Sequence, residues 1–332
     1  MHCLHKQQLP QQATRAAALH VACPLVRSVV LRATASEIVH VVQHSSVAEE
    51  LAPQEAAVVN RRRMVMLGCA CCSSLMLAGQ QSTAKASDGV LFTYGEEAGP
   101  LSWGGSCSTG LQQSPINLPS SSAAARACGS QPAPEFRYRR DNRVRVKNTG
   151  TTIQVNFEPG NSVSWGGAQL QLLQYHFHTP SEHAWGGQRR AMEAHLVHRE
   201  RATGRFAVVA VMLQPSSKGS SAQPNPCLAA ALAHVPATPQ AEAACPSSVN
   251  PQQLLPAGAA AGRFVHYTGS LTTPPCSEQV DWLVWEQPLP VADQQVLDFM
   301  HFAGGGHTYG HNARPLQQLN GRPLDYNCLA GA

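Results

Sequence analysis

No long hydrophobic run and no internal repeat organise this chain of 332 residues. An apolar segment near the N-terminus, Met64–Ala78, is shorter than the roughly 20 residues that a membrane helix needs. A fixed-period repeat, the mark of solenoids and propellers, is not evident either. These absences favour one globular domain behind a leader, with no stable membrane span in the mature chain.

An excess of one charge is also missing from most of the chain. The formal net charge of +4 comes from 24 basic and 20 acidic residues. Eight bases and four acids precede residue 87, which leaves sixteen of each beyond it. The basic run Arg137–Lys147 alternates with Tyr138, Val144 and Val146, which is typical of a strand with one solvated face. The charge balance therefore gives no support to a nucleic-acid partner.

The cysteines lack the spacing of a thiolate metal site. Five of the eleven lie in the leader, and the other six contain no Cys-x-x-Cys pair. That arrangement argues against a thiolate zinc site and against a thioredoxin-type redox pair. Cys227 and Cys245 flank an Ala-rich stretch and are one candidate disulfide, whereas the pairing of Cys128 and Cys328 stays open.

The N-terminal region has the features of a two-part targeting leader. Residues 1–60 contain Arg and Ala but few acids, and they resemble a plastid transit region. Residues 61–86 combine Arg61–Arg63, the apolar run and Ala84–Ala86, which match a twin-arginine-type signal peptide with an A-x-A cleavage site. A membrane anchor or a buried helix is the alternative. We expect cleavage after Ala86, a folded domain over residues 87–332, and location in the thylakoid lumen of a chloroplast.

The stretch Gln174–His183 carries the most specific chemistry. His176 and His178 are two residues apart, among Tyr175 and Phe177, a composition typical of a buried strand. Strand side chains alternate between faces, so both imidazoles leave the same face. In isolation, such a pair is more often two surface or hydrogen-bonded histidines than a metal site.

A second segment, Met192–His198, supplies a third imidazole. By the same alternation Glu193, His195 and Val197 share one face. Turn residues punctuate Thr179–Ala191, so the two strands can lie antiparallel and bring His195 to the first pair. Three neutral imidazoles with a fourth position left open form the arrangement of a catalytic zinc site. We therefore predict Zn2+ as the cofactor, with the ligands His176, His178 and His195.

A third stretch, Tyr267–Cys276, contains Gly-Ser-Leu-Thr-Thr-Pro-Pro. Together with Gln-Tyr-His-Phe-His, Ser-Glu-His and Glu-Ala-His-Leu-Val-His, it resembles the signature of the α-class carbonic anhydrases. The resemblance extends from Tyr94 to about Leu324. It implies a predominantly β, single-domain fold with a large, mostly antiparallel, twisted central sheet and short peripheral helices. It also implies reversible hydration of carbon dioxide to bicarbonate and a proton by a zinc-bound hydroxide, here for inorganic-carbon supply.

The resemblance assigns roles to residues around the three histidines. Thr272 matches the threonine that accepts a hydrogen bond from the hydroxide and donates one to Glu182. The partners expected for the other ring nitrogens of the ligands are Gln174, Glu193 and Asn312. The pocket for carbon dioxide matches Val197, Val208, Leu271, Thr273 and Trp282. Cys107 and Cys276 match positions that form a disulfide in secreted and organellar members, which implies an oxidising compartment.

Two positions depart from the family pattern. The strongest proton shuttle of the family is a histidine just after Asn-x-Gly; here Thr151 occupies that position or the chain is one residue shorter. Phe92 replaces a tryptophan. A threonine hydroxyl cannot hold a proton at neutral pH, whereas a histidine can. We therefore expect proton release to limit kcat, with His266 and His311 as the substitute relays to consider.

Two other functions remain to be weighed. His176-x-His178-x-x-x-Glu182 matches the start of a cupin metal motif, but His195 lacks the Pro-x-Gly context that cupins need. A catalytically weak, carbonic-anhydrase-like binding or assembly protein is the non-enzymatic alternative. Such relatives usually lack one zinc histidine, and all three are present here.

Apolar patterns predict the regular elements that carry these motifs. The predicted strands are Arg137–Lys147, Thr152–Phe157, Ala168–His178, Ala191–His198, Phe206–Leu213 and Val280–Glu286. One short helix is expected at Cys227–His234. Another is expected after a cap at Asp293, with Val296, Leu297 and Met300 facing inward.

Overall fold

The structure is a computed structural model of the chain, and it describes residues 84–85, 91–119, 128–129, 132–216, 223–258 and 262–327. The targeting hypotheses for residues 1–60 and 61–86 lie outside this part of the chain, apart from the two-residue strand β1 (Ala84–Lys85). Within the described residues, no helix is long and apolar enough to cross a membrane.

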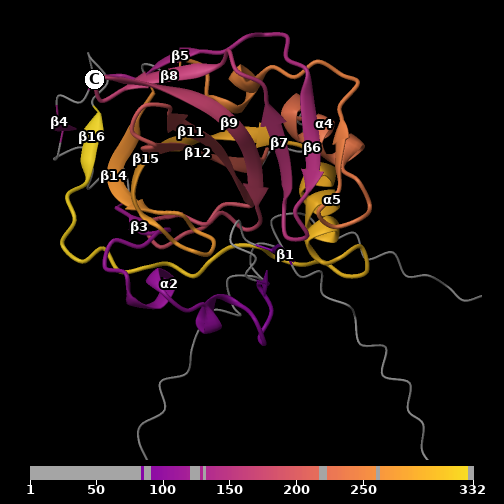
Figure 1. Cartoon of the computed structure of the whole chain (residues 1–332), viewed down its shortest axis with the longest axis horizontal. Helices are drawn as coiled ribbons and strands as arrows, with labels where there is room; N and C mark the ends of the chain where they lie inside the picture. Colours follow the sequence, from indigo (N-terminus) through magenta and orange to yellow (C-terminus); the bar gives the residue numbers. More distant parts are fainter. Residues whose placement is uncertain are drawn as a thin grey trace, which may run out of the picture. The chain divides into compact units, whose positions relative to one another are not determined.

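A large sheet dominates the described residues (Figure 1). Its strands run in the order β13-β6-β7-β9-β11-β12-β15-β14-β16-β4, with β8 on β9 and β5 on β8. All pairings in this sheet are antiparallel except β12 with β15 and β16 with β4. The strand bounds are β4 Cys128–Gly129, β5 Glu135–Arg137, β6 Val144–Asn148, β7 Ile153–Phe157, β8 Ser162–Trp165, β9 Ala168–His178, β11 Met192–Glu200, β12 Phe206–Pro215, β13 Glu242–Ala244, β14 Phe264–Ser270, β15 Glu278–Val291 and β16 Asp325–Asn327. The predicted fold class, mainly β with a large and mostly antiparallel sheet, is confirmed.

The remaining elements are short. Two small ladders pair β1 with β2 and β10 with β3. Their bounds, with those of the helices, are β2 Leu91–Phe92, β3 Asn117–Leu118, β10 Ala184–Trp185, η1 Pro100–Ser102, α2 Ser106–Thr109, α4 Pro226–His234, η2 Pro251–Leu254 and α5 Asp293–Ala303.

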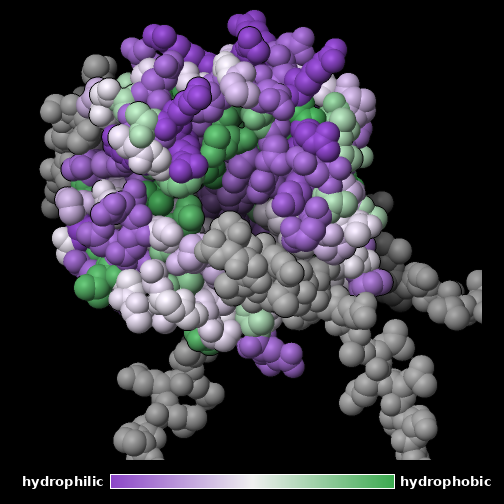
Figure 2. Space-filling model, viewed as in Figure 1, coloured by the Kyte–Doolittle hydropathy of each residue, from purple (hydrophilic) through white to green (hydrophobic). Residues whose placement is uncertain are grey.

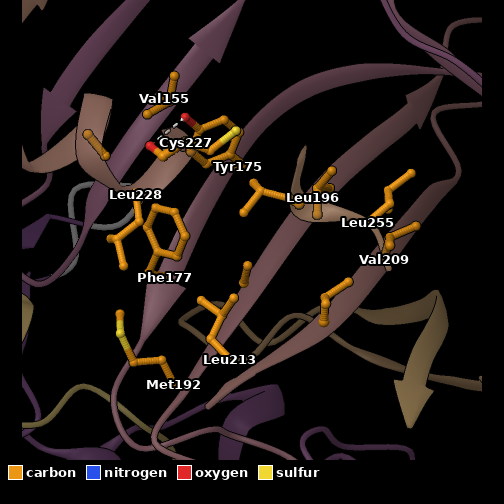
Figure 3. Packing of buried hydrophobic residues seen from close by; sticks show 14 of the residues in the cluster. Val155, Tyr175, Phe177, Met192, Leu196, Val209, Leu213, Cys227, Leu228 and Leu255 are labelled. Atoms are coloured by element: carbon orange, nitrogen blue, oxygen red, sulfur yellow. Dashed lines mark hydrogen bonds between the residues drawn. The ribbon is translucent and has the colours of Figure 1, made fainter. Parts of the chain in front are cut away.

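The strands alternate between two faces with different chemistry. We call the side that carries Leu172, Tyr175 and Phe177 the core face, and the side that carries His176 and His178 the histidine face. On the core face, buried apolar side chains of β6, β7, β9, β11 and β12 pack with α4, η2 and α5 in one cluster, and Figure 3 shows part of it. Within it the Tyr175 hydroxyl donates to the backbone oxygen of Cys227 over 3.0 Å. Burial of this apolar surface provides the main stabilisation of the sheet.

One predicted strand was wrong. Arg137–Lys147 is two strands, β5 and β6, joined by a turn rather than a continuous element. Asn142 in that turn is 7% exposed, and its amide donates to the backbone oxygens of Arg139 and Val249. A buried amide that bonds backbone groups locally competes with a strand ladder, and it breaks the strand here.

The predicted helix Cys227–His234 is confirmed as α4, whereas the second predicted helix and the second candidate disulfide need correction. The N-cap of α5 is Ala292 rather than Asp293, which is the first helical residue. Leu297 is half-buried, and Phe299 takes its place in the core beside Val296 and Met300. Cys227 and Cys245 are both buried in the core cluster as free thiols, so this candidate disulfide is not formed. Burial raises the pKa of the Cys227 thiol to about 12, so it stays protonated.

Candidate metal centre and active site

The pairing of β9 with β11 brings the three predicted ligands together. His195 lies directly opposite His176, and Glu193 lies opposite His178. The ring centroids of the three histidines are 5.0, 5.2 and 4.6 Å apart. The register shifts by one residue at Leu173, a β-bulge that reverses the alternation along β9. Because of this bulge, Leu172 and Tyr175 both reach the core face while the histidines stay on the other.

Each histidine has one ring nitrogen held by an acceptor. His176 Nδ1 donates to Gln174 Oε1 over 2.9 Å, and His178 Nδ1 donates to the backbone oxygen of Asn312 over 2.7 Å. His195 Nε2 donates to Glu193 Oε1 over 2.8 Å. All three contacts expected from the sequence are present. The lone pairs that remain available to a metal are those of His176 Nε2, His178 Nε2 and His195 Nδ1.

These three atoms are suited to a zinc ion. The ligand atoms of the triad lie within 4.8 Å of one another. His178 Nε2 is buried and has no hydrogen-bond partner in the described structure, as expected of an atom that coordinates a metal. Burial and the neighbouring imidazoles hold the pKa of His176 well below its usual value, and burial also lowers the pKa of His178. The His176 and His178 imidazoles are therefore neutral, which is the form that binds a metal.

A second cluster, His183, Glu193 and His195, also has ligand-type atoms within 4.8 Å. It is not a metal site, because both His183 nitrogens are engaged. His183 Nδ1 donates to Glu193 Oε1 over 2.7 Å, and its Nε2 accepts from the Tyr267 hydroxyl over 2.6 Å. The cluster is instead a hydrogen-bonded support for His195.

Comparison with known proteins decides the family. Residues 98–328 match the family model described as eukaryotic-type carbonic anhydrase. The chain belongs to the α-class carbonic anhydrases. The sequence-based family prediction is thus confirmed, and the reversible hydration of carbon dioxide is its activity.

Individual relatives agree with this assignment. A carbonic anhydrase of Pectobacterium carotovorum is 34% identical over 249 residues, which cover 72% of this chain and 92% of that protein. One from Nostoc is 33% identical over 272 residues, or 79% of this chain and 95% of that protein. The solved structure of Cah3 from Chlamydomonas reinhardtii in complex with acetazolamide is 48% identical. It has a TM-score of 0.65 and covers 72% of this chain and 100% of that chain.

The family assignment excludes the cupin hypothesis. In a cupin-type site Glu182 would coordinate the metal together with the histidines. In this carbonic anhydrase, Glu182 Oε1 accepts a hydrogen bond from the backbone N–H of Arg314 over 2.9 Å. Glu182 Oε2 is buried without a partner in the described structure, 3.5 Å from His178 Nε2 and 3.9 Å from His195 Nδ1.

Thr272 does not hydrogen-bond Glu182 within the described residues. Its side chain is 5% exposed, in the turn between β14 and β15. The turn is closed by the N–H of Cys276, which donates to the backbone oxygen of Thr273 over 2.9 Å. The expected contact would satisfy Glu182 Oε2, the orphaned oxygen.

His183 is a site residue that sequence reasoning missed. It starts a directed chain of hydrogen bonds from Glu193 through Tyr267 to Ser114, whose Oγ lies 2.8 Å from the Tyr267 hydroxyl. Burial raises the pKa of Tyr267 well above its usual value, so its hydroxyl keeps the proton it donates to His183. Gly269 is required here, since a Cβ would collide with Ser114 Oγ. The signal in the sequence was the Ser-Glu-His triplet, whose last residue had been given no role.

Arg314, two residues after Asn312 in the sequence, is the second residue that was missed. It is 1% exposed, and its guanidinium donates to Gln113 Oε1 and to the backbone oxygens of Ser114 and Cys107. Its backbone N–H holds Glu182 at the same time. One residue thus ties the N-terminal segment to the active site.

The expected apolar pocket residues also belong to one cluster on the histidine face. Val197, Val208 and Trp282 are at most 8% exposed, and Leu271 packs against them. The Trp282 ring lies 4.9 Å from that of His195. Thr273, also expected at the pocket, is half-buried. Figure 2 shows a hollow in the face turned to the viewer, with hydrophobic residues on one side and hydrophilic residues on the other.

The N-terminal segment is joined to the Thr272 turn by a covalent bond. Cys107 and Cys276 form a disulfide across 169 residues of chain. Phe92, the residue that replaces a tryptophan, packs edge-on against Trp103 near this bond, with ring centroids 5.4 Å apart. The phenylalanine therefore keeps the aromatic packing of this segment.

The two candidate proton relays differ in position. His266 lies on the core face, where its nitrogens are 2.9 Å from Asp281 and 3.3 Å from Asp325. His311 is exposed and precedes Asn312, whose amide donates to the backbone oxygen of Thr151 over 2.9 Å. Partial desolvation of its ring by the surrounding residues and the charge of Arg189 lower the pKa of His311. His266 is thus removed as a relay, whereas His311 remains adjacent to the Thr151 segment.

Proposed function

We propose that this carbonic anhydrase binds zinc and carbon dioxide on the histidine face with the residue roles set out here. Three neutral imidazoles hold the ion, and a zinc ion in such a site supplies an acidified water as the nucleophile. Glu193, Gln174 and Asn312 fix the tautomers and ring angles of the ligands. The observation that carries the proposal is the convergence of three ring nitrogens that make no hydrogen bond within the described residues, each on a ring whose other nitrogen is held.

Thr272 and Glu182 orient the reacting oxygen. A carboxylate accepts hydrogen bonds only, so the Thr272 hydroxyl can donate to Glu182 Oε2 and present its own lone pair to the nucleophile. Such an aimed acceptor, prepared before the reaction, lowers the reorganisation that the reaction requires. Val197, Val208, Leu271 and Trp282 form the apolar wall for carbon dioxide, which carries no charge and accepts only weak hydrogen bonds.

We also propose that the enzyme acts in the thylakoid lumen to supply inorganic carbon. The two-part pattern of residues 1–60 and 61–86 supports this location. The disulfide between Cys107 and Cys276 is consistent with an oxidising compartment. Expression of the full chain with a C-terminal reporter in an algal cell, followed by thylakoid fractionation, tests it. Protease-accessible reporter outside the thylakoid would contradict the lumenal location.

The active-site proposal is tested on the purified full chain. We expect one zinc per chain and carbon dioxide hydration that is lost after chelation and restored by zinc. His195→Ala should lose most of both, because two imidazoles cannot close the site. Stoichiometric zinc in His195→Ala would overturn the ligand assignment, and normal hydration by Thr272→Ala would overturn the role of Thr272.

A further inference from the structure

The exposed basic side chains of the described chain gather in one place. Seven Lys and Arg residues are exposed among the described residues, and five of these seven lie between residues 137 and 145. We call these five the arginine strip: Arg137, Arg139, Arg140, Arg143 and Arg145. Since bases and acids balance beyond residue 87, the strip is a local asymmetry of charge rather than a consequence of net charge.

The strip points outward because its neighbours point inward. Phe136 packs against Trp285 with ring centroids 5.8 Å apart, and Tyr138 stacks on His198. Val144 and Val146 of β6 are members of the buried core cluster. Strand alternation therefore places Arg137 and Arg145 on the solvent side. The other three arginines are exposed in the segment between β5 and β6. Figure 2 shows strongly hydrophilic side chains projecting along the upper edge of the view, over β5 and β8 of Figure 1.

The turn that carries the strip is held by buried amides. Asn161 is 1% exposed, donates to Asn142 Oδ1 over 2.8 Å and accepts from the backbone N–H of Arg139 over 2.8 Å. The Arg139 guanidinium lies over Gly160, where its carbon Cζ would be 3.1 Å from a Cβ. The arginines are thus presented on a fixed backbone, which reduces the entropy lost when a partner binds.

Most of the positive charge in the strip is uncompensated. Arg137 pairs with Glu135 at 3.5 Å and Arg145 with Glu242 at 3.1 Å, both on the surface. Arg139, Arg140 and Arg143 have no carboxylate partner within the described residues. Asp141, exposed among them, adds one acid to the strip and hydrogen-bonds Ser248.

We propose that the arginine strip docks an acidic surface of a partner protein. Guanidinium groups bind carboxylates through paired hydrogen bonds, which an amine cannot reproduce. Phe136 and Tyr138 are turned inward, so the strip offers no aromatic platform for stacking nucleic-acid bases. The exposed large hydrophobic side chains all lie elsewhere in the described chain, so nothing in the strip would insert into a membrane. Interleaved Glu135 and Asp141 suit a protein surface of mixed charge better than a uniform row of phosphates.

The test measures binding of the full chain to poly-L-glutamate at low ionic strength. We compare the wild type with R140Q/R143Q, which removes two unpaired charges and no contact in the described structure. The control, T308E/Q318E, makes the same change in net charge at exposed positions outside the strip. We expect R140Q/R143Q to bind about tenfold more weakly and the control to change by less than about twofold. R140K/R143K should recover only part of the loss, because lysine lacks the paired geometry.

Two further probes distinguish the class of partner: a DNA duplex and phosphatidylglycerol vesicles. If R140Q/R143Q weakens binding to either probe more than binding to polyglutamate, the strip belongs to that class and the proposal is overturned. Equal binding of polyglutamate by the wild type and R140Q/R143Q also overturns it. Carbon dioxide hydration and the urea midpoint should be unchanged in all variants, which shows that a binding loss is not unfolding.

Discussion

The two faces of the β9–β11 pair are built from the same strands but have different roles. On the core face, Tyr175, Phe177 and Leu196 are fully buried and lie in a large apolar cluster. On the histidine face, His176, His178 and His195 lie next to them in the sequence but carry hydrogen bonds and free lone pairs. One set of strands thus supplies stability on one side and chemistry on the other.

The comparison shows that the site depends on the core for its geometry, but the core depends little on the site. The histidines are held by short hydrogen bonds whose acceptors come from β9, β11 and the segment of Asn312. The sheet itself is stabilised by the apolar cluster and the ladder hydrogen bonds. Changes on the core face should therefore appear mainly in the free energy of unfolding, and changes on the histidine face in metal binding and rate.

Neighbouring substitutions on β9 give the largest expected contrast. Phe177→Ala should lower the free energy of unfolding by about 3–5 kcal/mol, because it leaves a cavity in the core. His176→Ala should change the stability of the metal-free protein little, yet lose most of the zinc. Urea unfolding of metal-free samples and zinc analysis measure both. Phe177→Leu is the milder control, and loss of zinc from its folded fraction would contradict the separation of the faces.

The disulfide tests whether the Thr272 turn depends on the distant N-terminal segment. Replacing Cys107 and Cys276 by Ser should lower the free energy of unfolding by about 2–5 kcal/mol, since the bond closes a loop of 169 residues. It should also lower kcat, because Cys276 lies four residues after Thr272. Reductant should affect the wild type but not the double variant. Two free thiols in non-reducing peptide mapping of the wild type would reject the bond.

His198 provides a pH test of the core face. Burial lowers its pKa to about 4, and the Tyr138 hydroxyl lies 2.7 Å from its Nε2. The unfolded chain therefore binds more protons than the folded one between about pH 4 and 6.5, so stability rises with pH in that window and is level above it. This group should cost up to about 3 kcal/mol at pH 4 relative to pH 7.

His198→Gln should remove that part of the pH dependence, because its amide oxygen can still accept from Tyr138 and does not titrate. Urea unfolding at pH 4, 5, 6 and 7 gives the comparison. An acid limb as steep in His198→Gln as in the wild type would show that other groups control acid stability.

Glu193→Gln tests the support of the metal. Glu193 accepts from His195, from His183 Nδ1 and from the His183 backbone N–H, and these imidazoles hold its pKa well below its usual value against the effect of burial. A glutamine amide has one oxygen instead of two, so it cannot accept all three of these hydrogen bonds. The affinity for zinc should therefore fall about 10- to 100-fold. Competition with a chelator measures it. Gln174→Ala, at a half-buried partner, should have the smaller effect; the reverse order would contradict the model of support.

The smallest expected effect concerns the proton. With Thr151 in place of a histidine, imidazole buffer should raise kcat by roughly a few-fold and leave kcat/KM nearly unchanged, because the buffer carries the proton. Thr151→His should recover part of the same gain. His311→Ala should increase the dependence on imidazole if His311 is the relay in use. A flat response to imidazole in both the wild type and His311→Ala would mean that another group releases the proton.

Much of the active site could be predicted from the sequence because strand alternation is a local rule. The spacing of His176, His178, Glu193 and His195 determines which side chains share a face, and the motif resemblance supplied Thr272, Glu182 and the disulfide. The strand Ala168–His178 has the predicted bounds. The pattern of alternating residues gave a wrong strand at Arg137–Lys147, because the buried side chain of Asn142 hydrogen-bonds the backbone locally and interrupts the strand.

The tertiary structure decided what depends on residues far apart in the chain. His183 meets Tyr267 across 84 positions, and Arg314 meets Gln113 across 201. The bulge at Leu173 is visible only in the register of β9 against β11. These contacts arise because the order of strands in the sheet and the paths of the loops bring distant segments together. The local sequence of one segment does not indicate which other segment it will contact. By itself the sequence determined the chemistry of the metal centre and the partners of its three ligands, whereas the contacts of His183 and Arg314 and the exposed arginine strip were decided by the fold.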